Sequence, residues 1–86
     1  MLENEEIRFP VDWNYRIICL KEATSAVDDI IKVLREHNCD ETPAQGRDSS
    51  NGKYQAYNVT VTFQDLESMR ALSSQLGALP CVKFLL

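Results

Sequence analysis

An Asn-Gly dipeptide at residues 51 and 52 is the feature that most constrains the fold of this 86-residue chain. A two-residue hairpin turn needs positive φ at both central positions, and asparagine and glycine tolerate it. Residues on both sides have an extended character, so the dipeptide predicts a tight hairpin in the middle of the chain. In that hairpin the facing pairs are Ser50 with Lys53, Gly46 with Tyr57, Ala44 with Val59, and Thr42 with Val61.

The two arms of the hairpin predict different positions in a sheet. Pro43 falls in the first arm, which must be an edge strand because proline cannot donate a hydrogen bond to a second neighbour. The second arm, residues 54–63, alternates apolar and polar side chains, which indicates one covered and one open face. Its apolar side holds Tyr57, Val59, Val61 and Phe63, and its polar side holds Ala56, Asn58, Thr60 and Thr62.

Two more strands are expected at the ends of the chain. Residues 13–20 are rich in aromatic and β-branched side chains, and the pattern predicts that Tyr15, Ile17 and Cys19 face the core. Residues 81–86 also alternate, which predicts Val82, Phe84 and Leu86 in the core. The opposite set, Cys81, Lys83 and Leu85, then lies on the open face.

Two amphipathic helices separate these strands. The first follows the caps Thr24 and Ser25, has an apolar stripe, and is expected to stop at Asn38. The second follows the cap Asp65 and is expected to end at Gly77. The stripes consist of Val27, Ile30, Ile31 and Leu34 in the first helix and Leu66, Met69, Leu72 and Leu76 in the second.

The resulting order, βαββαβ, predicts an α+β fold of the ferredoxin-like class. Its four-stranded antiparallel sheet has the strand order 4-1-3-2, with both helices on one face. Residues 9–86 form the single domain, and residues 1–8 form a mobile acidic N-terminal arm.

The face of the sheet that no helix covers is the predicted binding surface. The alternation places three cations and no carboxylate on it, in a chain of net charge −4. Fixed cations beside apolar side chains suit a partner protein, another sheet or an anionic ligand. The candidate binding residues are Arg16, Ile18, Arg47, Asn58, Thr60, Lys83 and Leu85, with Gln45, Ala56 and Cys81 on the same face.

Composition narrows the classes of partner and the cellular setting. The net negative charge argues against nucleic acid, and the longest apolar run, four residues from Ile17 to Leu20, argues against a membrane span. Three widely spaced cysteines do not form a disulfide framework, which favours a cytoplasmic location.

Several short segments match the YbeD-like family, small bacterial proteins of unassigned function. They are Phe9-Pro10, Tyr15-Arg16-Ile17, Arg47 with the run from Ser49 to Tyr54, and the ending from Val82 to Leu86. The chain resembles this family over nearly its whole length after the acidic arm. The resemblance implies a ferredoxin-like fold similar to the ACT regulatory domains, and it carries no established activity. ACT-type sites commonly use a glycine after the first strand, where this chain has residues 21–25 without one.

The candidate reactive groups do not predict catalysis, a metal or a cofactor. His37, Cys39 and Cys81 do not form the two paired clusters that zinc sites normally show. The hairpin loop, with Ser49, Ser50, Gly52 and Tyr54 in the shared family motif, lacks the spacing of a phosphate-binding loop. Acylphosphatases and RNA-recognition modules have the same topology. The chain lacks the glycine-rich loop of the former, and Tyr54 is the one aromatic candidate for the base stacking of the latter.

We therefore expect a non-enzymatic regulatory or adaptor domain that binds a partner protein, or itself as a homodimer, through the open face. One alternative is an ACT-like sensor of a small anionic metabolite or amino acid. A second alternative is an RNA-binding module.

Overall fold

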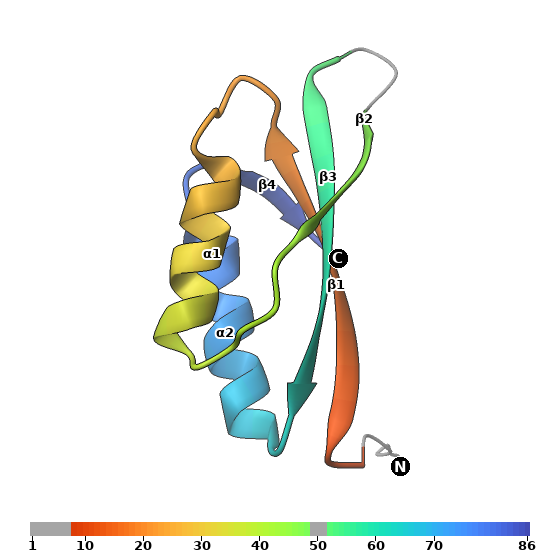
Figure 1. Cartoon of the computed structure of the whole chain (residues 1–86), viewed down its shortest axis with the longest axis vertical. Helices are drawn as coiled ribbons and strands as arrows, with labels where there is room; N and C mark the ends of the chain where they lie inside the picture. Colours follow the sequence, from red (N-terminus) through yellow and green to blue (C-terminus); the bar gives the residue numbers. More distant parts are fainter. Residues whose placement is uncertain (1–7, 49–51) are drawn as a thin grey trace.

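The computed structural model describes residues 8–48 and 52–86 as a four-stranded antiparallel sheet and two helices (Figure 1). The elements in chain order are β1 (Val11–Leu20), α1 (Ala26–Glu36), β2 (Ala44–Asp48), β3 (Tyr54–Phe63), α2 (Leu66–Ala78) and β4 (Val82–Leu85). The strand order is β2-β3-β1-β4, so the predicted ferredoxin-like topology is confirmed. The predicted arm at residues 1–8 lies outside the described residues except for Arg8.

Both helices lie on one side of the sheet, and the core fills the space between the layers (Figure 1). The central strands supply the predicted apolar side chains, because every second residue of β1 and β3 faces the helices. The fully buried side chains include Tyr15, Ile17, Cys19, Ile30, Leu34, Val61, Leu72 and Leu76. The hydroxyl of Tyr15 lies 2.6 Å from the hydroxyl of Ser73 on α2, which satisfies the polar end of this buried ring.

Helix α1 ends in a Schellman motif, as the stop at Asn38 predicted. Asn38 has φ 62, and its N–H donates to the carbonyl oxygen of Arg35 at 3.0 Å. The N–H of Cys39 donates to the carbonyl oxygen of Leu34 at 2.9 Å, which completes the pair of bonds. At the other end, Ser25 is the N-cap residue, but its hydroxyl donates to the Asp29 carboxylate rather than capping a backbone N–H.

Helix α2 begins at the predicted cap and ends beyond the predicted stop. The carboxylate of Asp65 accepts a hydrogen bond from the N–H of Ser68 at 2.7 Å. The end predicted at Gly77 is wrong, because the helix continues to Ala78. Pro80 explains the difference, since the residue before a proline is driven to extended geometry, and Leu79 has ψ 132.

The register of β2 differs from the tight-hairpin prediction. Ala44 faces Asn58 and Gln45 faces Tyr57, so the predicted pairs of Ala44 with Val59 and Gly46 with Tyr57 are wrong. β2 ends at Asp48, which faces Gln55, and one extra residue of β2 is accommodated between these pairs. Thr42 and Pro43 precede the strand, so the predicted place of Pro43 within it is wrong, whereas the edge position of β2 is confirmed.

Two predictions about the hairpin loop concern residues that are only partly described. Gly52 has φ 68, the left-handed conformation expected of it, and Lys53 precedes β3. The predicted turn residue Asn51 and its neighbours Ser49 and Ser50 lie outside the described residues.

A β-bulge in β4 reverses the predicted faces of the residues that follow Lys83, whereas Val82 packs against the core as predicted. Ile18 faces Phe84 while Cys19 faces Val82, so Lys83 is an extra residue between two otherwise adjacent pairs. Leu85 faces Ile17 and packs against the core, instead of lying on the open face. Phe84, predicted to be in the core, lies on the open face with Ile18.

Candidate functional site

Four of the predicted binding residues lie together on the helix-free face of the sheet. Arg16 faces Asn58 across the central pair of strands, and the flanking positions of β1 and β3 hold Ile18 and Thr60. They share this face because their neighbours Tyr15, Ile17 and Val59 are buried under the helices. The two central strands therefore present one cation, one aliphatic side chain and two polar side chains side by side.

Other predicted members of this face lie elsewhere. Leu85 and Cys81 belong to the core side of the sheet. Gln45 is on that side too, where its amide donates to Gln55 at 3.0 Å. Lys83 is exposed at the bulge, and the side chain of Arg47 lies outside the described part of the structure. Among the described side chains, the predicted cluster of three cations is therefore represented by Arg16, with Lys83 at the edge.

The open face also holds a carboxylate that the sequence analysis missed. Asp12 lies on it at the far end of β1, opposite Thr62. The hydroxyl of Thr62 donates to the Asp12 carboxylate at 2.6 Å. Asp12 precedes Arg16 by four residues, which puts the two charges two positions apart along the same face.

The open face carries an apolar patch at the end where β4 pairs with β1. We define the β4-end patch as Ile18, Leu20, Tyr54, Phe84 and Leu86. Phe84 is 54% exposed, and its ring centroid lies 6.3 Å from that of Tyr54 in an edge-to-face arrangement. Leu86 is 67% exposed and exchanges backbone hydrogen bonds with Arg16 at 3.1 and 2.8 Å, which places it beside Arg16 on the open face.

Phe84 and Leu86 could not be assigned to this patch from the alternation alone. Residues 81–86 are apolar at positions of both parities, so either register buries apolar side chains. Only the bulge at Lys83 decides which set is outside.

A small pocket lies next to the patch, at the end of β1. Leu20, Glu22, Gly52, Lys53 and Tyr54 line its volume of about 360 Å³. The backbone N–H of Lys21 donates to the carbonyl oxygen of Lys53 at 2.9 Å, which ties the turn after β1 to the start of β3. Two predicted loop residues, Gly52 and Tyr54, thus belong to one pocket.

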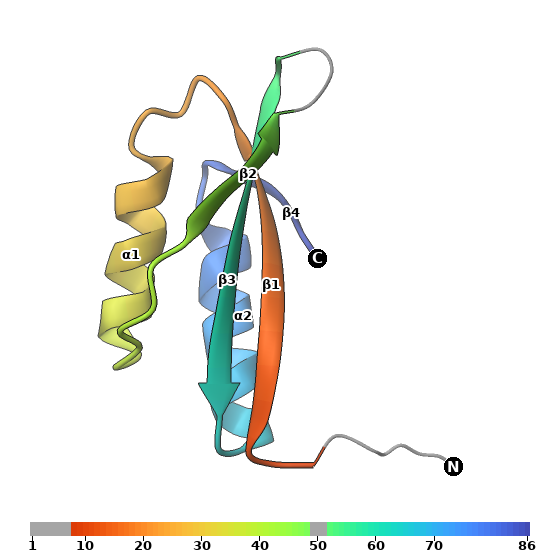
Figure 2. The ribbon, with the colours of Figure 1, turned by 45° about the vertical axis from the view of Figure 1, so that its right-hand side comes forward.

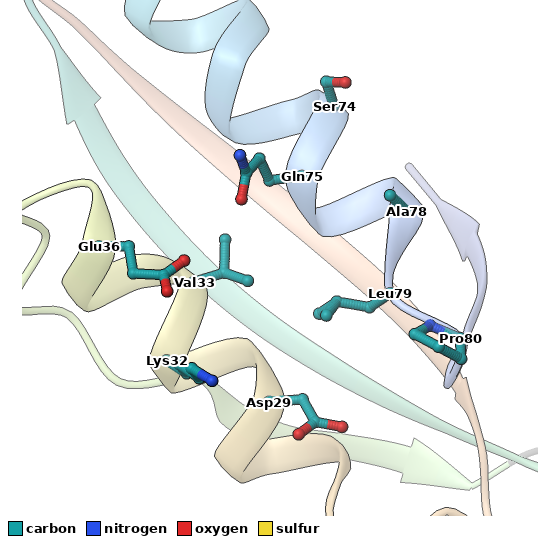
Figure 3. Close-up of a pocket in the computed structure, with 9 residues that line it drawn as sticks. All are labelled: Asp29, Lys32, Val33, Glu36, Ser74, Gln75, Ala78, Leu79 and Pro80. Carbon is teal, nitrogen blue, oxygen red and sulfur yellow. The ribbon is translucent and has the colours of Figure 1, made fainter.

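The helix layer has a groove between α1 and α2, with a volume of about 530 Å³ (Figure 3). Val33 and Leu79 point into it, and Asp29, Lys32 and Glu36 surround them along α1 (Figure 3). Its lining mixes one amine with two carboxylates, which gives no consistent charge for a ligand.

The two candidate reactive cysteines, Cys39 and Cys81, are separated, and the environments of all three cysteines suppress thiolate formation. Burial, with a smaller contribution from the Cys81 thiol beside it, raises the pKa of Cys19 to about 12. Burial also raises the pKa of Cys81 and of Cys39. Cys81 and Cys39 do not meet, because Cys81 lies in the core whereas Cys39 follows α1 and contacts the carbonyl oxygen of His37. A thiol held protonated is a poor nucleophile and a poor metal ligand.

Metal-ligating side chains do not gather within residues 8–48 and 52–86, where no group of three His, Cys, Asp or Glu has a metal-binding arrangement. In the same residues no helix is both long and apolar enough to cross a membrane.

Comparisons with known proteins give a family and a fold, and no activity. The family model described as "Protein of unknown function (DUF493)" matches residues 4–86. UPF0250 proteins of Yersinia pestis (strain Pestoides F) and Yersinia pseudotuberculosis (serotype I) are each 30% identical over 83 residues, which cover 96% of this chain and 94% of the relative. The solution structure of HP0495 from Helicobacter pylori is similar with a TM-score of 0.81 and 20% identity, over 98% of this chain and 89% of that one. The resemblance seen in the sequence is thereby confirmed, and the chain belongs to the DUF493 family of proteins of unknown function.

Proposed function

We propose that this domain is a non-catalytic adaptor whose open sheet face docks onto a partner protein. The observation that carries the proposal is the position of Phe84, 54% exposed beside Ile18 on a sheet face without helices. An exposed aromatic ring among aliphatic neighbours loses unfavourable hydration when a partner covers it. Aromatic side chains of this kind are common anchors in protein interfaces.

The charges around the β4-end patch define the chemistry of the partner. Arg16 lies between Asn58 and Leu86 on the open face, so its guanidinium borders the apolar surface. Lys83 is exposed at the adjoining bulge. A partner that fits presents an apolar side chain to Phe84 and a carboxylate to Arg16, and the charge pair sets its orientation.

A photo-cross-linking amino acid at position 84 in the native cell tests the proposal. The control places the same group at Leu66, which is 40% exposed on α2. A protein captured from position 84 and not from position 66 is then purified, and its binding to the wild-type domain is measured by calorimetry.

Variants of the purified domain give the decisive comparison. Phe84→Ser and Arg16→Glu should each weaken binding at least tenfold, by about 1.4 kcal/mol or more. The matched controls Leu66→Ser and Arg70→Glu change an exposed apolar side chain and an exposed arginine on α2, and they should leave the affinity unchanged. Equal binding by Phe84→Ser and wild type contradicts docking through this face.

Single-stranded RNA is a second candidate ligand, favoured by the same ring. Phe84 lies near Tyr54 and the cation Arg16, and RNA-binding sheets stack bases on exposed aromatic rings. The net charge of −4 opposes it. Phe84→Leu separates the candidates, because it keeps an apolar side chain for a protein partner and removes the ring needed for stacking. RNA binding predicts a salt-dependent titration that this variant abolishes.

A small anionic metabolite is the third candidate, and the pocket beside Lys53 and Tyr54 is its site. Glu22 on the same lining opposes an anion, which makes this candidate weaker. A thermal-shift screen with amino acids and organic acids tests it, since a ligand that binds only the folded state raises the melting temperature. No shift at millimolar ligand rejects the sensor.

A further inference from the structure

The first half of β1 has a hydrogen-bonding edge that no described strand covers. β4 pairs only with Ile17, Ile18 and Cys19, and Leu86 continues the ladder to Arg16. Along Val11–Tyr15, the described residues leave the side of β1 away from β3 without a neighbour, as Figure 2 shows for the lower part of β1.

The alternation of an antiparallel ladder identifies the backbone groups on this edge. Arg16 exchanges both of its hydrogen bonds with Leu86, so its N–H and carbonyl point away from β3. Asp12 and Asn14 have the same parity, and their backbone groups point the same way. Five residues of strand therefore present two N–H and two carbonyl groups in a row.

This edge lacks the features by which sheets usually prevent pairing. Protected edges carry lysine, an internal proline or a bulge, whereas Val11–Tyr15 pairs with β3 in an unbroken register and has Asp12 as its one charge. Trp13 lies in the middle of the segment and is 38% exposed. A large ring at an uncovered edge is suited to contact with a second strand.

We propose that this edge pairs with the same edge of a second copy of the chain, antiparallel and centred on Trp13. A two-fold axis at Trp13 places Asp12 of one copy opposite Asn14 of the other, and each such pair exchanges two hydrogen bonds. The two sheets then join into one continuous sheet, with the two Trp13 rings as a cross-strand pair on the helix side.

Both ends of the free edge fit this register. Residue 16 of one copy faces residue 10 of the other, and Pro10 has no N–H to donate. The intermolecular ladder therefore ends before Arg16, whose backbone groups already bond to Leu86. If the second copy were shifted toward residue 20 of β1, its strand would collide with Leu86. If it were shifted toward residue 10, one hydrogen-bonded pair would be lost.

The charges of the open face are also self-complementary in this register. Asp12 and Arg16 lie on the same face of β1, and Arg16 is the diagonal neighbour of Asp12 in the second copy. The symmetry produces this opposite-charge contact twice, whereas the like-charge contact between the two Asp12 side chains, which are also diagonal to each other, occurs once. Charge complementarity favours a second copy over an unrelated extended peptide.

Sedimentation velocity of the full 86-residue chain over a concentration series tests the pairing, with Trp13 fluorescence as the second signal. Trp13 is the single tryptophan, so its emission should shift to shorter wavelength as dimer forms. Asn14→Pro removes from each copy one backbone N–H that points away from β3, together with the side-chain oxygen that accepts from the Thr60 hydroxyl, and should weaken association about tenfold. Circular dichroism of each variant verifies that it is folded.

A charge exchange provides a test that does not alter the backbone. Asp12→Arg should weaken association roughly fivefold, because like charges then meet on the diagonal. Adding Arg16→Asp to that variant should restore it. Thr62→Val is the matched control, since it removes the same hydrogen bond to Asp12 and leaves the charge unchanged.

The outcomes separate this interface from the proposed adaptor face. A chain that stays monomeric at millimolar concentration overturns the edge pairing, as does a dimer that Asn14→Pro and Asp12→Arg leave equally tight. A dimer lost on Phe84→Ser and retained in Asn14→Pro is formed by the β4-end patch instead, and also overturns it.

Discussion

The side-chain amide of Gln55 donates to the backbone carbonyl oxygen of Gly46 at 2.8 Å, across the irregular part of the β2–β3 pair. The same amide donates to the carbonyl oxygen of Ala56 at 3.0 Å, and its oxygen accepts from Gln45. Gln55 is 4% exposed, so one buried side chain supplies partners that the bulged ladder does not.

Replacing Gln55 should therefore destabilise the domain more than replacing an exposed glutamine does. We expect Gln55→Leu to cost about 1–3 kcal/mol, because the carbonyl oxygens of partly buried Gly46 and of buried Ala56 each lose a donor. Urea unfolding followed by circular dichroism measures this. Gln64→Leu, at an exposed position, is the control and should change stability by less than about 0.5 kcal/mol. Equal effects of the two substitutions would show that the network is not important.

The left-handed Asn38 makes a second prediction about stability. At φ 62, Asn38→Val should cost about 1–2 kcal/mol, because a β-branched side chain collides with the backbone in this conformation. Asn38→Gly should be neutral or stabilising, since glycine is favoured after a helix end. The melting temperature should fall in Asn38→Val, and it should rise or stay unchanged in Asn38→Gly. A tolerated valine would contradict the Schellman geometry.

The cap at Asp65 predicts a dependence of stability on acid pH. Hydrogen bonds from Ser68 lower the pKa of Asp65 below its ordinary value of 3.8. The folded state therefore favours the carboxylate. Its stabilising effect is fully present at pH values above the ordinary pKa of 3.8, and it is lost as the pH falls through the lowered pKa of the folded state. Asp65→Asn keeps an acceptor for the Ser68 N–H and should show a shallower loss of stability with acid. Unfolding curves from neutral pH to pH 2 compare the two proteins.

Buried thiols predict a loss of stability in alkali. The pKa of Cys19 is raised from 9.0 to about 12, so the folded state holds the proton that the unfolded chain releases. Stability should be unaffected below about pH 9 and should fall as the pH rises toward 12. Burial likewise raises the pKa of Tyr15, whose contribution begins near its ordinary value of 10.0.

Cys19→Ala should reduce the loss of unfolding free energy between about pH 9 and pH 10, the range below tyrosine ionisation. Urea unfolding at steps between neutral pH and pH 10 measures it, with the exposed-side substitution Thr60→Ala as the control. An unchanged alkaline slope in Cys19→Ala would mean that the thiol is not shielded in the folded state.

The fold could be predicted from the sequence because its strongest signals are local and agree with one another. The apolar alternation of β3, the end of α1 before Asn38 and the cap at Asp65 each depend on neighbouring residues, whereas the buried side of α1 consists of Ala26, Ile30, Val33 and Leu34, so the predicted stripe was right only at Ile30 and Leu34. Right-handed connections then leave few arrangements, and the strand order follows.

The composition of the open face could not be predicted to the same extent, because it depends on two bulges. An extra residue in β2 moves Gln45 to the helix side, and Lys83 in β4 moves Leu85 inward and Phe84 outward. A bulge is stabilised by interactions distant in the chain, such as the bond from Gln55 to Gly46, and no local pattern marks it. Arg16, Ile18, Asn58 and Thr60 were placed correctly because β1 and β3 pair in a regular register. Whether they bind anything stays a prediction.

The extra residue at Lys83 has a consequence for how this molecule can vary. Side chains on either side of it are apolar, so a regular strand that kept Lys83 in the ladder would exchange an aromatic exterior for an aliphatic one and would still have a hydrophobic interior. Loss of the Lys83 codon would instead give a regular strand that still displays Phe84, so the outward aromatic ring depends on keeping residue 83 out of the ladder.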